Sequence, residues 1–182
     1  MKKLIFITVL FLLSSTAHST IKENIINNLI NTKNLNFDFE QNINGKIETG
    51  NCTIEYPKKI YCKYISSKKI MVSNGKSLVI KTRSGNYYRY AIERTPLNYI
   101  LDKKYLIKNI QNLSERIIDD KFINFRIYEN GNDINLFFNK EDLNIIGWQT
   151  VDIYQNLNIT FLSKIKKNQI LKKNIFKLPS IN

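Results

Sequence analysis

The feature that most constrains the fold of this chain is an apolar–polar alternation of period two, interrupted by turn signals. Phe37, Phe39 and Gln41 alternate with polar neighbours, which is typical of a β-strand with one buried face. Asn44-Gly45 follows at once, and Asn-Gly is a strong signal for a two-residue hairpin turn. The sequence therefore predicts antiparallel strands joined by short turns.

The same two signals recur to the end of the chain. Strands are expected at residues 36–43, 46–56, 60–65, 70–73, 76–83, 87–92, 121–128, 133–138, 145–154 and 157–163. Turns are expected at Asn74-Gly75, Ser84-Gly85-Asn86, Glu129-Asn130-Gly131-Asn132 and Gln155-Asn156. No Pro/Gly/Ser-rich linker separates these segments, so residues 20–182 are expected to form one domain.

Helical patterns precede and interrupt the strands. Thr20 to Lys33 carries an apolar stripe at helical spacing, and Thr20 with Glu23 fits a capping box. Thr95 and Pro96 fit the N-cap and first residue of a short helix. Residues 103–120 fit either another helix or an irregular crossing.

These elements predict an α+β fold that is mainly β. An open, strongly curved antiparallel sheet with helices on its concave side accommodates them. The buried face is rich in Phe, Tyr, Ile and Leu. Composition leaves two alternatives open: this face packs solid against the helices, or it leaves a cavity.

The N-terminus has the pattern of a secretory signal peptide at residues 1–19. Lys2 and Lys3 precede the apolar run 4–13, and Ala17 and Ser19 occupy the small-residue positions of a cleavage site. The run of about ten residues is half of what a membrane span needs. The mature chain is therefore expected to be secreted.

The chain has two cysteines, Cys52 and Cys62, and secretion bears on whether they are bonded. A hairpin centred on Pro57 places Cys52 directly opposite Cys62, and Ile54 opposite Ile60. Directly opposed thiols on one face are close enough to bridge, and secretion supplies an oxidising environment. A structural disulfide is predicted, with free buried thiols as the alternative.

The remaining chemistry is sparse. The one histidine, His18, lies in the signal segment, which excludes His-dependent triads and the usual zinc sites from the mature chain. The acidic pairs 119–120 and 141–142 carry no catalytic spacing. We therefore expect neither an enzyme nor a metal site. The formal charge of +13 is scattered along a secreted chain, which argues against nucleic acid as a partner.

An ordered set of local motifs gives a resemblance to a known family. In chain order, it comprises Phe39-x-Gln41, Gly50 before Tyr56-Pro57, Val72-Ser73-Asn74-Gly75-Lys76-x-Leu78, Thr95-Pro96-Leu97 with Ile100-Leu101, Asp142-Leu143-x-x-x-Gly147, and Phe176-x-Leu178-Pro179. This set resembles the periplasmic outer-membrane lipoprotein carriers of the Lol pathway, the LolA family. The resemblance covers nearly all of residues 20–182.

The resemblance implies a half-open antiparallel barrel in which helices cover a hydrophobic cavity. It further implies a monomeric chaperone without cofactors. Such a carrier accepts acylated lipoproteins from an inner-membrane, ATP-driven (ABC transporter) releasing complex and delivers them to an outer-membrane receptor. The alternative is a periplasmic lipid or lipoprotein sensor of the anti-sigma-factor regulator type, which shares the fold and usually carries a second domain. The receptor itself is disfavoured because no lipidation cysteine lies near residue 19.

One position departs from the family pattern. Carriers of this family often have Arg-Pro where this chain has Tyr56-Pro57, and the arginine is associated with closing the lid. A tyrosine hydroxyl can donate a hydrogen bond but supplies no cation. The Cys52–Cys62 pair is also not a general family feature, and we hypothesise that it stiffens this hairpin.

Candidate ligand-binding residues are the apolar positions on one strand face and on the short helix. They are Phe37, Phe39, Ile54, Tyr56, Leu78, Ile80, Tyr88, Tyr90, Leu97, Ile100, Leu101, Leu136 and Phe138. Ordinary core packing is the competing interpretation for each. Trp148, the sole tryptophan, is expected to cover the sheet. Lys68, Lys69, Lys103 and Lys104 are expected to form a solvated charged surface, with a basic rim for docking as the alternative.

Overall fold

A computed structural model describes residues 20–151 and 156–180. The expected signal peptide at 1–19 lies outside these ranges. So does Gln155, the first residue of the expected turn Gln155-Asn156. Strands form one eleven-stranded antiparallel sheet in the order β6-β5-β4-β3-β2-β1-β11-β10-β9-β8-β7. Their bounds are β1 Asn34–Ile43, β2 Lys46–Glu55, β3 Lys59–Tyr64, β4 Ile70–Asn74, β5 Ser77–Lys81, β6 Tyr87–Ala91, β7 Arg116–Ile118, β8 Phe122–Glu129, β9 Asn132–Asn139, β10 Ile145–Val151 and β11 Leu157–Lys167.

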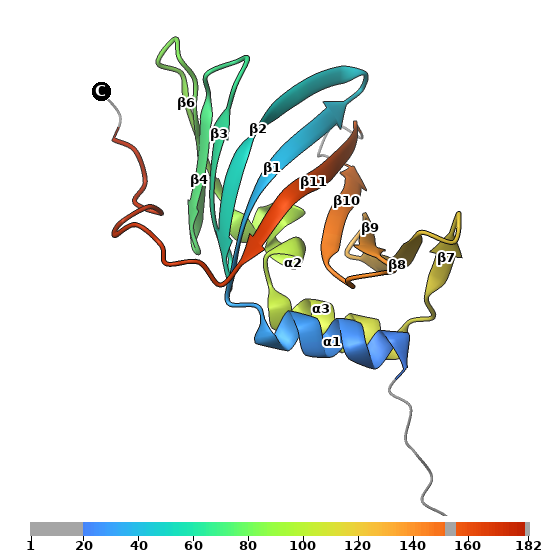
Figure 1. The fold of residues 1–182 in the computed structure, drawn as a ribbon. Helices are drawn as coiled ribbons and strands as arrows, with labels where there is room; N and C mark the ends of the chain where they lie inside the picture. Colours follow the sequence, from blue (N-terminus) through green and yellow to red (C-terminus); the bar gives the residue numbers. More distant parts are fainter. Residues whose placement is uncertain (1–19, 152–155, 181–182) are drawn as a thin grey trace, which may run out of the picture.

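The sheet consists of two meanders that meet at its centre. Strands β1 to β6 form one, β7 to β11 form the other, and β1 pairs antiparallel with β11. The outermost strands β6 and β7 do not pair with each other, so the sheet curves without closing into a barrel (Figure 1). The expected open half-barrel is confirmed.

Helix α1 (Ile21–Asn31) starts and packs as its sequence predicts. The Thr20 hydroxyl accepts a hydrogen bond from the Glu23 amide, and the Glu23 carboxylate accepts one from the Thr20 amide, which completes the capping box. Ile25, Ile26 and Leu29 form its buried face. Figure 1 shows α1 beside α3 at one end of the half-barrel.

The segment between the two meanders is helical over most of residues 92–112. Of the two alternatives for residues 103–120, the helix is present over their first half. A 3₁₀ turn (Ile92–Arg94) leads into α2 (Leu97–Ile100) and then α3 (Lys103–Asn112). Asp102 caps α3 by accepting from the Tyr105 amide. The short strand β7, which follows, was not expected. It has only three residues, and its Ile117 is 52% exposed, so it shows no alternation of apolar buried and polar exposed residues.

The β2–β3 hairpin has the register expected from its sequence. Cys52 lies opposite Cys62 and Ile54 opposite Ile60, and the two cysteines form a disulfide. The turn between them contains a cis Tyr56-Pro57 bond. Both half-cystines are buried on the concave face, so the hairpin is fixed from inside the half-barrel.

Strand β11 runs four residues beyond the expected end at Ser163. The register against β1 shifts between Asn36 and Asp38, and Lys164 adopts a φ of 51° there. These features describe a β-bulge, which adds a residue to one strand and breaks the period of two. The alternation of apolar and polar residues stops at the bulge, so the predicted strand ended there, whereas the pairing with β1 continues to Lys167.

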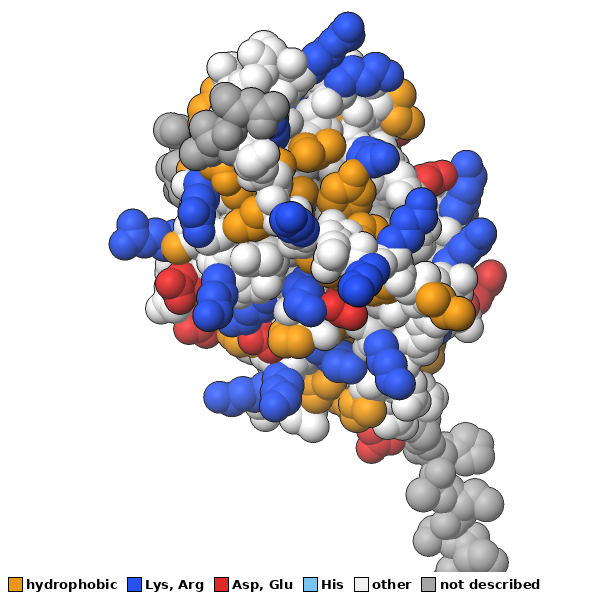
Figure 2. Space-filling model, turned by 90° about the vertical axis from the view of Figure 1, so that its left-hand side faces the viewer, with side chains coloured by type: hydrophobic (Ala, Val, Ile, Leu, Met, Phe, Trp, Pro, Cys, Tyr) orange, Lys and Arg blue, Asp and Glu red, His pale blue; other side chains and the backbone are white. Residues whose placement is uncertain are grey.

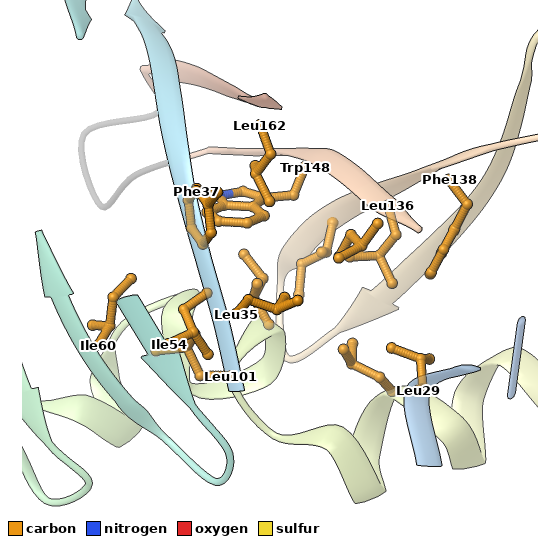
Figure 3. Close-up of a cluster of buried hydrophobic side chains, with 14 of the residues drawn as sticks. Leu29, Leu35, Phe37, Ile54, Ile60, Leu101, Leu136, Phe138, Trp148 and Leu162 are labelled. Atoms are coloured by element: carbon orange, nitrogen blue, oxygen red, sulfur yellow. The ribbon is translucent and has the colours of Figure 1, made fainter. Parts of the chain in front are cut away.

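Side chains from both meanders and from α1 share one core. Phe37 of β1 meets Trp148 of β10 edge to face, with ring centroids 6.5 Å apart. Figure 3 shows Leu35 and Ile54 from the first meander, Leu136 and Phe138 from the second, and Leu29 from α1 lining the same interior. This core holds the two halves of the sheet at a fixed curvature.

The C-terminal segment crosses the outer face of the first meander. Val72 and Val79 face away from the cavity-side residues of β4 and β5, yet are 1% and 0% exposed. On this side the Lys59 ammonium lies 5.8 Å from the Phe176 ring, and the Lys81 ammonium donates to the Ser180 carbonyl at 3.1 Å (Figure 1). A second, thin apolar layer therefore lies under residues 170–180.

Candidate functional site

A cavity of about 220 Å³ lies on the concave face of the first meander, against the β10–β11 hairpin and beneath α2. Its lining comes from the strands around it and from the segment before and within α2. The lining residues are Phe37, Phe39, Gln41, Cys52, Ile60, Cys62, Tyr64, Met71, Leu78, Ile80, Thr95, Pro96, Leu97, Ile100, Trp148, Thr150, Asn158 and Thr160. The concave face thus packs solid at one end and leaves a cavity at the other.

Strand geometry explains which side chains point into this cavity. Alternate residues of a strand share a face, so Phe37, Phe39 and Gln41 line it while Asp38 and Glu40 lie on the other side of the sheet. Directly opposed residues also share a face. The pairs Phe37–Cys52 and Cys52–Cys62 therefore carry the lining across three strands, and the disulfide forms part of the cavity floor.

The roof consists of Thr95, Pro96, Leu97 and Ile100. Thr95 was expected to cap α2, but its hydroxyl donates to the Ile92 carbonyl at 2.8 Å, and Pro96 occupies the N-cap. This expectation was wrong because Thr95 is the C-cap of the preceding 3₁₀ turn and hydrogen-bonds back to that turn. The roof is consequently a single helical turn without a side-chain cap.

Two contacts connect the roof to the β2–β3 turn. The Lys58 amide donates to the Leu101 carbonyl at 2.8 Å, and the Lys58 ammonium lies 3.5 Å from the Asp102 carboxylate. The Lys58 and Asp102 side chains are 31% and 27% exposed, so this ion pair contributes little by itself. The roof is therefore held to the sheet by few polar contacts.

The end of the cavity farthest from α1 is polar. The Gln41 carboxamide accepts from the Tyr64 hydroxyl at 3.1 Å and donates to Asn158 at 3.1 Å and to Thr160 at 3.3 Å. Thr150 lies opposite Asn158 on the neighbouring strand and lines the same end. We refer to Gln41, Tyr64, Thr150, Asn158 and Thr160 as the polar band.

A charged pair adjoins the polar band. Lys69 forms an ion pair with Glu48, whose side chain is 5% exposed, and the Lys69 ammonium lies 4.1 Å from the Tyr64 ring centroid. Burial of the Glu48 carboxyl raises its pKa, but hydrogen bonding led by Lys69 outweighs burial and holds the pKa below its usual value. Lys69, expected to be a solvated surface residue, therefore has a buried partner.

Six of the thirteen candidate residues line the cavity: Phe37, Phe39, Leu78, Ile80, Leu97 and Ile100. Tyr88 and Tyr90 lie opposite Ile80 and Leu78, so they continue the same face onto the edge strand β6. There they are 46% and 42% exposed. They extend the apolar lining beyond the closed part of the cavity.

Five candidates lie elsewhere. Ile54, Leu101, Leu136 and Phe138 are fully buried in the core beside the cavity. Tyr56 lines a very small space between α1 and the sheet. Periodicity assigns a residue to the concave face, but it does not say which part of that face the helices fill.

Tyr56 packs against a cation instead of supplying one. The Lys103 ammonium lies 5.9 Å from its ring centroid and donates to the Ile30 and Thr32 carbonyls at 2.9 Å each. Burial lowers the pKa of Lys103. Lys103 thus joins the start of α3 to the end of α1, near the position where the family often has arginine.

Some lining residues were not among the candidates. Trp148, expected to cover the sheet, also borders the cavity, as do Met71 and the two half-cystines. Trp148 and Thr150 are two residues apart on one strand, as Phe37 and Phe39 are. This spacing is the sequence signal that could have added them to the candidate residues. The polar band was missed because selection followed apolar residues alone.

A larger and shallower groove of about 760 Å³ lies on the convex face. It is open to solvent and is bordered by Asp38, Glu40, Lys63 and Lys68 beside the exposed Phe161. Figure 2 shows Lys and Arg side chains spread over one face of the molecule, with hydrophobic side chains between them. Charges of both signs border the groove, so it selects no particular partner.

The structure describes residues 20–151 and 156–180. Within these ranges, no group of three or more His, Cys, Asp or Glu side chains is placed to hold a metal ion. No helix within them is both long and apolar enough to cross a bilayer.

Comparison with known proteins agrees with this geometry. The family model described as outer membrane lipoprotein carrier protein LolA matches residues 30–179. No curated protein matches the chain. An uncharacterized conserved protein from Thermus thermophilus has a similar structure, with a TM-score of 0.52 and 8% identity over 87% of this chain and 92% of that chain. This likeness supports the fold.

Two other solved structures are more distant. A putative outer membrane lipoprotein-sorting protein domain from Vibrio parahaemolyticus gives a TM-score of 0.46 at 6% identity, covering 85% of this chain and 95% of that chain. A LolA superfamily protein from Nitrosomonas europaea gives 0.44 at 9% identity, covering 86% and 97%.

Proposed function

This chain belongs to the outer membrane lipoprotein carrier protein family, and we propose that its concave cavity shields the acyl chains of lipoproteins in the periplasm. The observation that carries the proposal is an apolar cavity with a thin roof, continued by exposed tyrosines on an open sheet edge. Residues 1–19 act as a signal peptide that brings the chain to this compartment.

The energetics of acyl chains require such a protein. Exposing a methylene to water costs about 0.8 kcal/mol, so one long chain costs roughly 10 kcal/mol or more. A carrier must therefore replace the membrane interior with apolar side chains. Phe37, Leu78 and Ile100 offer such surface at the same cavity.

The cavity must widen to accept this cargo. Its volume of about 220 Å³ is below the ~300–1,000 Å³ of ordinary small-molecule pockets. Few polar contacts hold the roof to the β2–β3 turn, so its displacement away from Lys58 opens the cavity toward Tyr88 and Tyr90. Cargo binds by shifting the population toward this open form.

The partners follow from the family. An inner-membrane, ATP-driven complex loads the carrier and an outer-membrane receptor unloads it, while the carrier acts as a monomer. Neither transfer makes or breaks a covalent bond, so the proposal involves no cofactor and no catalytic residue.

Native mass spectrometry of the mature protein tests the proposal. The protein is co-expressed with a triacylated lipoprotein and its releasing complex, or with an unacylated variant of the same lipoprotein. A one-to-one complex with the acylated form alone is expected. Equal binding of both forms would contradict recognition of the acyl chains. Absence of binding to either form would overturn the carrier function and favour the sensor alternative.

A matched pair of variants localises the binding. Leu97→Glu places a charge in the roof of the cavity, whereas Ile117→Glu places one on the exposed strand β7. We expect Leu97→Glu to abolish the complex and Ile117→Glu to retain it. Loss in both, or in neither, would contradict this site.

A further inference from the structure

Two hydrogen-bond donors of the polar band have no partner among residues 20–151 and 156–180. Thr150 is 5% exposed and lines the cavity, and its hydroxyl has no partner in the part of the chain that the structure describes. The Asn158 carboxamide accepts from Gln41, but its own NH₂ group has no partner within the same residues. Buried donors are normally satisfied, so a ligand that fills the cavity and covers these two should bring an acceptor.

The two donors are adjacent. Thr150 and Asn158 are directly opposed on β10 and β11, so their side chains lie on one face within reach of a single group. The apolar lining begins directly beside them with Trp148, one alternation before Thr150. A ligand that fills the apolar part must therefore present its next segment to these donors.

The charges nearby narrow the chemistry of this segment. Glu48 and Lys69 pair with each other at the edge of the band, and Lys46, which also acts on Glu48, is exposed. None of the described residues that line the cavity is charged. A phosphate or a free carboxylate would need an unpaired cation there. An uncharged carbonyl oxygen, as in an ester or an amide, needs only neutral donors.

We infer that the polar band binds the ester or amide carbonyls that join acyl chains to the head of a lipidated ligand. The inference rests on the carrier function proposed above and specifies its substrate class and orientation. Thr150 and Asn158 donate to the carbonyl oxygens, the acyl chains lie toward Leu97 and Ile100, and the head leaves the cavity at the polar end.

Binding of two matched probes tests this inference. One is a synthetic diacylglyceryl-cysteine peptide, and the other is its dialkyl ether analogue, which has the same chain lengths but lacks the ester carbonyls. The dissociation constant (Kd) of each is measured by displacement of a fluorescent fatty acid. We expect wild-type protein to bind the ester about fivefold more tightly than the ether, as one net hydrogen bond provides.

Three variants locate the preference. Thr150→Val removes the hydroxyl at nearly constant volume, and Asn158→Asp removes the NH₂ donors while it keeps the acceptor for Gln41. For each variant, the ratio of the two Kd values is expected to fall to about one, because the carbonyl has lost a donor. Thr49→Val makes the same change on the opposite face of the sheet and is expected to retain the preference.

The outcomes separate the two levels of the argument. If neither probe binds wild-type protein, the carrier function fails. If both probes bind wild-type protein equally, or if Thr150→Val keeps the preference, the cavity holds acyl chains but the polar band does not recognise carbonyls. A variant that binds the ether more weakly yet keeps the ester preference contradicts the inference equally, and if one variant binds neither probe, the other variant decides.

Discussion

At the scale of single residues, Gly50 occupies the tightest position of the sheet. A Cβ atom built there would lie 2.1 Å from the Lys63 carbonyl oxygen and 2.6 Å from the Phe39 ring. The Phe39 ring packs across this glycine against Tyr64, with centroids 4.9 Å apart. The absence of a side chain at Gly50 thus allows both aromatic rings to line the cavity.

We therefore expect Gly50→Ala to lower the free energy of unfolding by about 3 kcal/mol, because backbone and ring must both move. Urea unfolding followed by tryptophan fluorescence measures it. Thr49→Ala on the adjacent, outward-facing position serves as the control and should cost less than about 1 kcal/mol. Equal costs for the two variants would mean that the close approach at Gly50 relaxes freely.

The ion pair of Glu48 and Lys69 gives stability a pH dependence. The folded-state pKa of Glu48 lies below its usual value of 4.5, so its contribution is present above that value and is lost as the pH falls through the folded-state pKa. Glu48→Gln should cost about 2 kcal/mol at pH 7, less than the loss of one partner of a fully buried pair. The reason is that the Lys69 side chain is 21% exposed.

Unfolding free energies at several pH values check this prediction. The difference between wild type and Glu48→Gln should narrow below about pH 4.5, where protonation neutralises the wild-type carboxyl. Glu141→Gln, at an exposed position, is the control and should leave stability at pH 7 within about 0.5 kcal/mol of wild type. A constant difference between wild type and Glu48→Gln down to about pH 3 would rule out the ion pair as its cause.

At the scale of elements, the β2–β3 hairpin combines a structural and a functional role. Its disulfide closes a short loop and lies on the cavity floor. Replacing both cysteines by alanine, or reducing the bond, should lower the free energy of unfolding by about 2.5–3 kcal/mol in the chain-entropy treatment. Chemical denaturation with and without reductant measures the change, and the double variant should not respond to reductant.

The rate of lipoprotein release tests whether the disulfide of this hairpin stiffens the cavity wall. Lipoprotein release to a receptor should become faster after reduction, because the floor strands β2 and β3 lose their cross-link. Release that proceeds at an unchanged rate would remove the disulfide from the carrier mechanism and leave it a purely stabilising role.

Local signals predicted elements well wherever chemistry acts between near neighbours. The Thr20–Glu23 capping box, the Asn44-Gly45 turn and the Cys52–Cys62 register all depend on a few adjacent residues, and all are present. The turn expected at Asn74-Gly75 lies one residue later, at Gly75-Lys76. The bulge at Lys164 and the exposed strand β7 were missed. The bulge depends on pairing with β1, which is distant in sequence and which periodicity does not contain. Strand β7 is only three residues long and pairs with the adjacent β8 without an alternation of burial.

At the scale of the whole molecule, sequence alternation predicts which residues face the concave side, but it does not predict where on that side a cavity remains. Alternation assigned Phe37, Ile54 and Phe138 to one face, but only the position of α1, α2 and α3 decides which part of the face remains unfilled. Ile54 and Phe138 lie where the core is filled, whereas Phe37 borders the space beneath α2. Helix placement is a tertiary property, so the sequence predicted the face and not the cavity.

The motion of the roof is the last prediction, and one amide reports it. The Lys58 amide donates to the Leu101 carbonyl, so it joins the sheet to the roof and must open when the roof is displaced. Binding of an acylated lipopeptide should therefore accelerate hydrogen exchange at Lys58 by about tenfold or more, since opening exposes this amide. The Ile60 amide, within the β2–β3 ladder, should remain protected and serves as the internal control. A bound complex in which Lys58 stays as protected as in the free protein would mean that the sheet, rather than the roof, makes room for the acyl chains.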